Sequence, residues 1–111
     1  MDVVIPVEKQ FQAYNSHDLD TFVSCYSDDF IAYRMPNMSP SLQGKEALRT
    51  FYKHHRFNNA ALRAELISRT VLGNNVFDHE MIYGIYDTPV NSIAVFEVEK
   101  GLIKTAWFYF E

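Results

Sequence analysis

The chain has 111 residues, which is enough for one domain with one hydrophobic core. A net charge of −4 without a basic run excludes the usual electrostatics of a nucleic-acid-binding protein, and 48% hydrophobic residues exclude a disordered chain. The one cysteine, Cys25, excludes an internal disulfide and fits a reducing compartment. The N-terminus carries Asp2 and no long apolar segment, so we expect a cytoplasmic protein without a membrane partner.

Two helices are predicted near the N-terminus. Pro6 suits the first turn of a helix, and apolar residues then recur at helical spacing to about Asn15. Asp18 can cap a second, short helix whose apolar face comprises Leu19, Phe22, Val23 and Tyr26. Residues 27–29 are predicted to form a turn.

A short strand at 30–34 and a loop at 35–43 are predicted next, because the loop segment is rich in proline and serine. A third helix is predicted over 44–56. From there the apolar pattern alternates, which predicts strands at about 61–72, 75–86, 91–99 and 102–110. Short turns separate them, so they should be antiparallel neighbours. The expected fold is α+β, with N-terminal helices packed on a curved antiparallel sheet that encloses a conical pocket.

The strand that begins near Val76 contains three consecutive titratable residues in an otherwise apolar run. In a strand, Asp78 and Glu80 lie on one face, about 7 Å apart, and His79 lies on the other. If Asp78 and Glu80 both face an apolar cavity, one of the two carboxyl groups should have a raised pKa and could act as an acid or base. The alternative is that both carboxylates are solvated or paired with surface basic residues.

Several segments together resemble the NTF2-like superfamily, and within it the SnoaL-like group, relatives of ketosteroid isomerase. The likeness covers nearly the whole chain and is carried by Ala13-Tyr14-Asn15 with Asp18-Leu19-Asp20, Ser27-Asp28-Asp29, Gly44-Lys45-Glu46-Ala47-Leu48, Leu72-Gly73-Asn74, Val76 to Glu80, Phe96 to Glu99 and Ala106-Trp107-Phe108. It implies a cone-shaped, cystatin-like α+β fold as a single domain over residues 1–111. It implies no single activity, because the fold hosts isomerases, cyclases, hydrolases and binders.

The resemblance also shows what this chain lacks. The positions of the isomerase's catalytic tyrosine and two catalytic aspartates are matched here by Gln10, Arg34 and Ala94. Tyr26 and Tyr52 match positions where some of those enzymes hold supporting tyrosines. We therefore do not expect steroid isomerisation by the known mechanism.

The strand register of the family implies which side chains face inward. The implied pocket lining is Tyr14, Tyr26, Phe30, Ala32, Tyr52, Ile82, Ala94, Phe96, Phe108 and Phe110, with Asp78, Glu80 and Arg34 as catalytic candidates. Periodicity alone favours the opposite assignment, because Phe77, Met81, Tyr83 and Ile85 form the more apolar face. Both hold if the outer face is a homodimer interface formed by Phe77, His79, Met81, Tyr83, Ile93, Val95, Trp107 and Tyr109.

Other polar residues carry two interpretations each. Arg34 can clamp an anionic ligand or bridge to Asp78 or Glu80. His79 fits a role at the interface better than one in a proton relay. His54 and His55 lie near the end of a helix, where they either interact favourably with the helix dipole or line the cavity mouth. His17 is expected in solvent. No metal motif or glycine-rich loop is present in the sequence, so we expect no metal and no cofactor.

These patterns predict a protein that binds a small apolar or aromatic molecule, with cofactor-free acid–base catalysis of the isomerase, cyclase or hydrolase type as one possibility. A non-catalytic binding module and a dimerisation domain that fills its own cavity are the alternatives.

Overall fold

The computed structural model describes residues 2–111, which form three helices and six strands. In chain order the elements are α1 (Val4–Ser16), α2 (Leu19–Ser24), β1 (Tyr26–Arg34), β2 (Ser39–Gln43), α3 (Lys45–His55), β3 (Arg63–Leu72), β4 (Asn75–Tyr83), β5 (Val90–Glu99) and β6 (Leu102–Phe110). The α+β expectation is confirmed, and the three helices and the last four strands begin and end within a few residues of the predicted bounds.

The strands form one sheet in the order β2-β1-β6-β5-β4-β3. The run from β3 to β6 is an antiparallel meander, as the short turns predict. The expectation of a wholly antiparallel sheet is wrong for one pair, because β1 runs parallel to β6. The helix α3 and four strands lie between these two elements in the chain, so their connection is long enough for the parallel arrangement.

Two segments predicted as turn and loop are strands. Residues 27–29 belong to β1, and the pairing of β1 with β6 shifts register between Tyr26 and Ile31. The turn-forming residues therefore occupy a bulge rather than a chain reversal. Residues 39–43 form β2 at the open edge of the sheet, where Pro40 and the serines are tolerated because the outer side needs no ladder hydrogen bonds.

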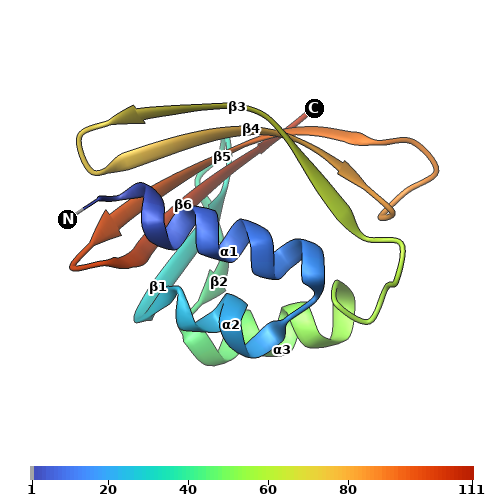
Figure 1. Ribbon diagram of the computed structural model, residues 1–111, viewed down its shortest axis with the longest axis horizontal. Helices are drawn as coiled ribbons and strands as arrows, with labels where there is room; N and C mark the ends of the chain where they lie inside the picture. The colour runs from blue at the N-terminus through green and yellow to red at the C-terminus, as the bar shows by residue number, and fades with distance from the viewer. Residues whose placement is uncertain (1) are drawn as a thin grey trace.

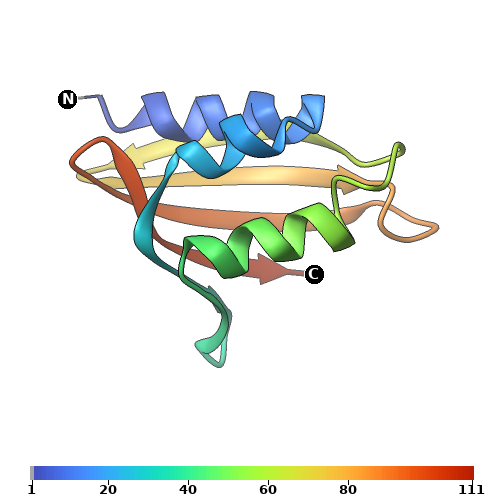
Figure 2. The ribbon, with the colours of Figure 1, turned by 90° about the horizontal axis from the view of Figure 1, so that it is seen from below.

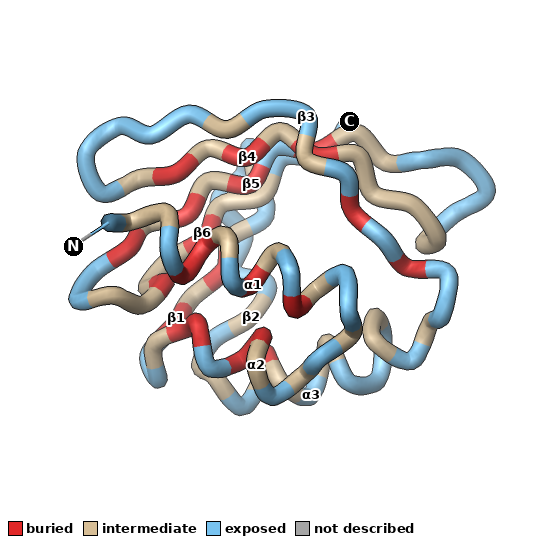
Figure 3. Tube along the Cα trace, in the orientation of Figure 1, coloured by how far each residue is buried: buried red, intermediate tan, exposed pale blue. Residues whose placement is uncertain are grey.

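All three helices lie on one side of the sheet, which curves around them (Figures 1 and 2). The buried residues gather where the helices meet β1, β4, β5 and β6, while β3 is exposed over much of its length (Figure 3). Phe22, Phe30, Leu48 and Ile103 are among the largest fully buried side chains. The core therefore fills one end of the space under the sheet.

Two contacts fix the far end of that space. The side chain of Asn15 on α1 accepts from the Ala64 backbone N–H at 2.7 Å and donates to its carbonyl at 2.9 Å. Gly84, after β4, has φ +98°, and it lies so close to the Ala61 backbone that an added Cβ would clash with the Ala61 carbonyl group. Both contacts hold the start of β3 against its neighbours, close to where the cavity begins.

Candidate functional site

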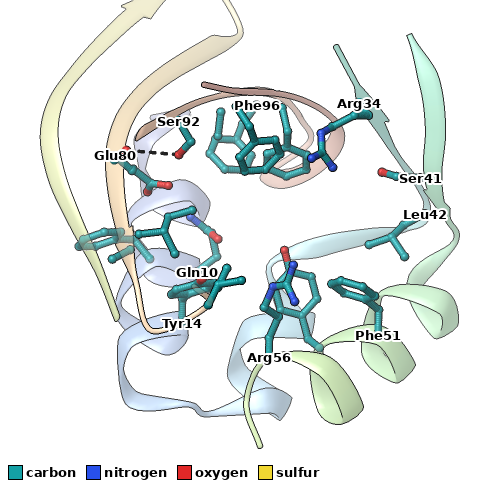
Figure 4. Close-up of a pocket in the computed structure, with 18 of the residues that line it drawn as sticks. Gln10, Tyr14, Arg34, Ser41, Leu42, Phe51, Arg56, Glu80, Ser92 and Phe96 are labelled. Atoms are coloured by element: carbon teal, nitrogen blue, oxygen red, sulfur yellow. Dashed lines mark hydrogen bonds between the residues drawn. The ribbon is translucent and has the colours of Figure 1, made fainter. Parts of the chain in front are cut away.

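A cavity of about 220 Å³ lies between the helices and the concave face of the sheet (Figure 4). Its wall is mostly aromatic and aliphatic and is formed by Gln10, Phe11, Tyr14, Tyr26, Arg34, Ser41, Leu42, Phe51, Tyr52, Arg56, Ala64, Glu80, Ile82, Ile85, Ser92, Ala94, Phe96, Phe108 and Phe110. Eight of the ten side chains expected in the pocket lining lie in this wall. Phe30 and Ala32 do not, because they are fully buried in the core beneath it.

Glu80 is the one acidic side chain in the cavity wall among the described residues 2–111. It lies in the middle of β4, and alternation along that strand buries Val76, Asp78 and Glu80 while leaving Phe77 and His79 half-exposed. Glu80 is 9% exposed, and within residues 2–111 no protein group donates a hydrogen bond to its carboxyl. Burial in this apolar wall, together with the nearby Asp78 carboxylate, raises the pKa of Glu80 to about 8.

Asp78 lies on the same face of β4 but does not reach the cavity. Its side chain is fully buried, and Arg69 of β3 donates to both carboxylate oxygens at 2.7 and 2.9 Å. A third bond joins Arg69 to Glu8 of α1 at 2.8 Å. Asp78 is thus held in a charge network that joins the sheet to α1.

The expected bridge from Arg34 to Asp78 or Glu80 does not form among the described residues, because Arg69 takes that place. Arg34 is at the exposed end of β1, with its guanidinium 4.2 Å from the ring centre of Phe110. Arg56, which follows α3, lies 4.9 Å from the ring centre of Phe51. Both arginines line the cavity, Arg34 across from Glu80 and Arg56 at the lower centre of the view (Figure 4).

A hydrogen-bonded group of polar side chains lies at the inner end of the cavity. The Tyr26 hydroxyl donates to Gln10 Oε1 at 3.0 Å, and Gln10 Nε2 donates to the Val7 carbonyl at 3.0 Å. Tyr14 and Tyr52 also line the wall. Burial raises the pKa of Tyr14 and Tyr26 and raises that of Tyr52 to about 12, and the Glu80 carboxylate adds to the rise in all three. These tyrosines therefore remain protonated hydrogen-bond donors across the physiological range.

The outer face of the sheet carries the residues expected at a dimer interface. Cross-strand partners form two rows across β4, β5 and β6, one of Phe77, Val95 and Trp107 and one of His79, Ile93 and Tyr109. All are half-exposed or exposed, as are Met81 and Tyr83. His79 Nε2 lies 2.6 Å from Asn91 Oδ1, so this histidine points away from the cavity.

The remaining histidines lie elsewhere. His54 and His55 are exposed in the last turn of α3 and do not line the cavity. The expectation of a solvated His17 is wrong, because its ring stacks on Phe57 and Nε2 lies 2.8 Å from the Leu62 carbonyl oxygen. Within residues 2–111 no cluster of histidine, cysteine and carboxylate side chains is suited to a metal, and no helix is long and apolar enough to cross a membrane.

The predicted pocket lining left out several residues of the site, and only some of them had a signal in the sequence. Gln10 and Phe11 lie about one helical turn before Tyr14, so the predicted Tyr14 indicated that this face of α1 lines the cavity. Ser92 lies directly opposite Glu80 across the strand pair. Arg56 had no sequence signal beyond its place at the end of a helix, because only the packing of α3 brings it to the cavity.

Comparison with known proteins agrees with this architecture. Residues 7–106 match the sequence model of the SnoaL-like domain family. No curated protein sequence matches the chain significantly.

Three solved structures are similar to the chain. An NTF2-like protein of unknown function from Burkholderia xenovorans superposes with a TM-score of 0.82 at 21% identity, over 98% of this chain and 82% of that one. A proposed ketosteroid isomerase from Kribbella flavida gives 0.84 at 13% identity, over 98% and 77%. A computationally designed 17-OHP binder gives 0.80 at 16% identity, over 97% and 90%. At these identities the likeness establishes the NTF2-like fold and leaves activity to the site itself.

Proposed function

The chain belongs to the SnoaL-like domain family, and on that premise we propose that it binds a small apolar or aromatic molecule and performs cofactor-free proton transfer on it with Glu80. The reaction class is that of an isomerase or cyclase acting on a carbon acid. The observation that carries this proposal is that the Glu80 carboxyl lines a mostly apolar cavity and has no hydrogen-bond partner among residues 2–111.

The size of the cavity limits the ligand. A cavity of about 150 Å³ lined by apolar side chains admits benzene, whereas sites for drug-sized ligands begin at about 300 Å³. The 220 Å³ here suits a molecule of one or two rings. The same volume disfavours the third interpretation, a dimerisation domain whose cavity is filled by its own side chains.

Proton transfer by Glu80 follows from its surroundings. A carboxylate in an apolar wall without a protein hydrogen-bond donor is a stronger base than one in solvent. With a pKa of about 8, Glu80 has both its protonated and its ionised form populated at neutral pH. The protonated hydroxyls of Tyr14 and Tyr52 can donate to an oxygen on which negative charge develops. Asp78 is not the acid or base in this proposal, because Arg69 occupies both of its oxygens.

A generic carbon acid tests the base without knowledge of the natural substrate. In 5-nitrobenzisoxazole, a base removes the proton on the ring carbon next to nitrogen, the C–H electrons complete a nitrile, and the N–O bond breaks to release a coloured cyanonitrophenolate. We expect the protein to accelerate this reaction, with a rate that rises with pH and levels off above about pH 8.

Glu80→Gln should slow the reaction by about 100-fold to 10,000-fold, the usual contribution of a general base. Glu65→Gln is the matched control, because Glu65 is an exposed glutamate on the neighbouring strand β3 and lies outside the cavity. A loss of less than about tenfold in Glu80→Gln would overturn the catalytic role.

Non-catalytic binding is the second candidate, favoured by the same pKa. With a pKa of about 8, Glu80 is mostly protonated at pH 7 and can donate a hydrogen bond to a ligand carbonyl. Ligand-dependent stabilisation without acceleration of any proton transfer would select this function.

The proposal includes a homodimer and a cytoplasmic location. The rows of apolar side chains on the outer sheet face support the dimer, since monomers rarely expose contiguous apolar patches of more than a few hundred Å². The buried, unpaired Cys25 supports a reducing compartment.

A further inference from the structure

We infer that the ligand of this cavity carries a carboxylate, which Arg34 and Arg56 hold at the mouth while its apolar or aromatic body lies inside. This inference names the ligand class and rests on the proposed function only in that the cavity binds a small molecule. It does not depend on catalysis by Glu80.

The first support is the charge balance of the mouth. Among residues 2–111 every ion pair lies outside the cavity wall, and neither Arg34 nor Arg56 has a carboxylate partner. The chain has four more acidic than basic residues, so carboxylates are in excess elsewhere on the molecule. Two guanidinium groups without an acidic partner in the wall of one cavity therefore make part of that wall positive on an acidic protein.

The second support is that both guanidinium groups are positioned. Arg34 lies over Phe110 and Arg56 over Phe51, and both rings belong to the cavity wall. Stacking of this kind fixes the plane of the guanidinium and leaves its N–H edges directed outward from the ring. Arg56 uses Nη1 for the His55 carbonyl at 2.8 Å, and its other donors have no partner within the described chain.

The third support is the arrangement of charge along the cavity. Figure 4 shows Glu80 at the upper left of the open space, Arg34 of β1 across from it at the upper right, and Arg56, after the end of α3, below both. An anionic group at the mouth would satisfy the arginines and remain on the far side from the Glu80 carboxyl. The aromatic wall between them fits an apolar body. Planar, two-pronged binding by arginine suits a carboxylate in particular.

The test is a comparison of matched ligands by calorimetric titration at low salt. Benzoate, phenylacetate and 3-phenylpropionate are each compared with the corresponding amide, which has nearly the same shape and no charge. We expect at least one acid to bind about tenfold or more tightly than its amide, with affinity falling as salt rises.

Arg34→Gln and Arg56→Gln should each weaken binding of the acid by about tenfold and leave binding of the amide unchanged. Arg63→Gln is the matched control, because Arg63 also stacks on an aromatic ring, that of Tyr83 at 4.2 Å, and does not line this cavity. Circular dichroism and thermal melting of each variant check that the fold is intact.

Each outcome separates this inference from the proposed function. Equal binding of acids and amides would overturn the carboxylate inference and leave an apolar ligand site with Glu80 as its base. Acid-selective binding that depends on both arginines would support the inference. If Glu80→Gln also kept full activity in the proton-transfer assay, the catalytic role of Glu80 would be removed while the inference stood. Failure of all three acids to bind would overturn the inference.

Discussion

Arg69 holds Asp78 by two hydrogen bonds, from Nε at 2.7 Å and from Nη2 at 2.9 Å, and thereby leaves Glu80 as the acidic group that faces the cavity. The two carboxyls lie two residues apart on one face of β4, yet their surroundings differ. One meets a guanidinium in a fully buried site, and the other meets aromatic rings. This division of roles follows from the partners of each residue and not from its position on the strand.

The Arg69–Asp78 pair predicts a large effect on stability. Arg69→Gln would leave a fully buried aspartate without its cation, so we expect a loss of about 3–5 kcal/mol in the free energy of unfolding. Arg49→Gln is the matched control, because its partner Asp20 is largely exposed and such pairs contribute about 1 kcal/mol or less. Urea denaturation of both variants measures the difference, and similar losses would contradict the structural role of the buried pair.

The pKa of Glu80 predicts how stability changes with pH. The pKa is about 8 in the folded protein and near 4.5 in the unfolded chain, so the folded form binds the extra proton between these values. This group's contribution is therefore fully present below pH 4.5 and is lost as pH rises through 8, a change on the order of a few kcal/mol.

Glu80→Gln should accordingly flatten the decline of unfolding free energy between about pH 5 and pH 8. Glu65→Gln should leave the decline as it is in the unaltered protein, since Glu65 is exposed. Parallel stability curves for the protein and its Glu80→Gln variant would show that the carboxyl is already ionised in the fold.

Gly84 predicts a steric effect at the edge of the cavity. Both Gly84 and Gly73 have positive φ, at +98° and +60°, but a Cβ at Gly84 would meet the Ala61 backbone whereas one at Gly73 would meet nothing within 4 Å. We expect Gly73→Ala to cost about 1 kcal/mol from backbone conformation alone. Gly84→Ala should cost about 1–3 kcal/mol more, because the Ala61 backbone must move. Equal melting temperatures for the two variants would contradict this close approach.

The outer sheet face predicts self-association. Trp107→Arg places a charge in the row of Phe77, Val95 and Trp107, so it should convert dimers into monomers in size-exclusion chromatography with light scattering. Tyr86→Arg is the control, because Tyr86 is 71% exposed and lies after the end of β4. A protein that is monomeric before any substitution, or a Trp107→Arg variant that remains dimeric, would contradict this interface.

Much of the fold was predictable because the apolar period changes from helical to alternating near residue 61, and glycine- and asparagine-containing turns separate the later strands. The first half of the sheet was not. β2 has an exposed, proline-containing sequence typical of a loop, and it forms a strand because β1 supplies its hydrogen bonds. The register shift in β1 similarly concealed the start of that strand.

The candidate site was predictable in part. Both faces of β4 are rich in apolar residues, so periodicity could not choose between them, and the register of the related family placed Glu80 inward. Arg69 was recoverable, because counting outward from the turn at Gly73-Asn74 pairs it with Asp78. Arg56 was not recoverable, since its approach to the cavity depends on how α3 packs under the sheet.

The most direct measurement of the central claim is a pH titration of the Glu80 side-chain carboxyl by carbon-13 NMR, with Glu80→Gln used to assign the signal. The structure predicts a midpoint at about pH 8, because the carboxyl is buried in an aromatic wall without a hydrogen-bond partner among the described residues. Binding of a ligand in the cavity should shift this midpoint. A midpoint near the ordinary value of 4.5 would contradict the account, since Glu80 would then be a solvated surface carboxylate and not an acid–base group of an apolar pocket.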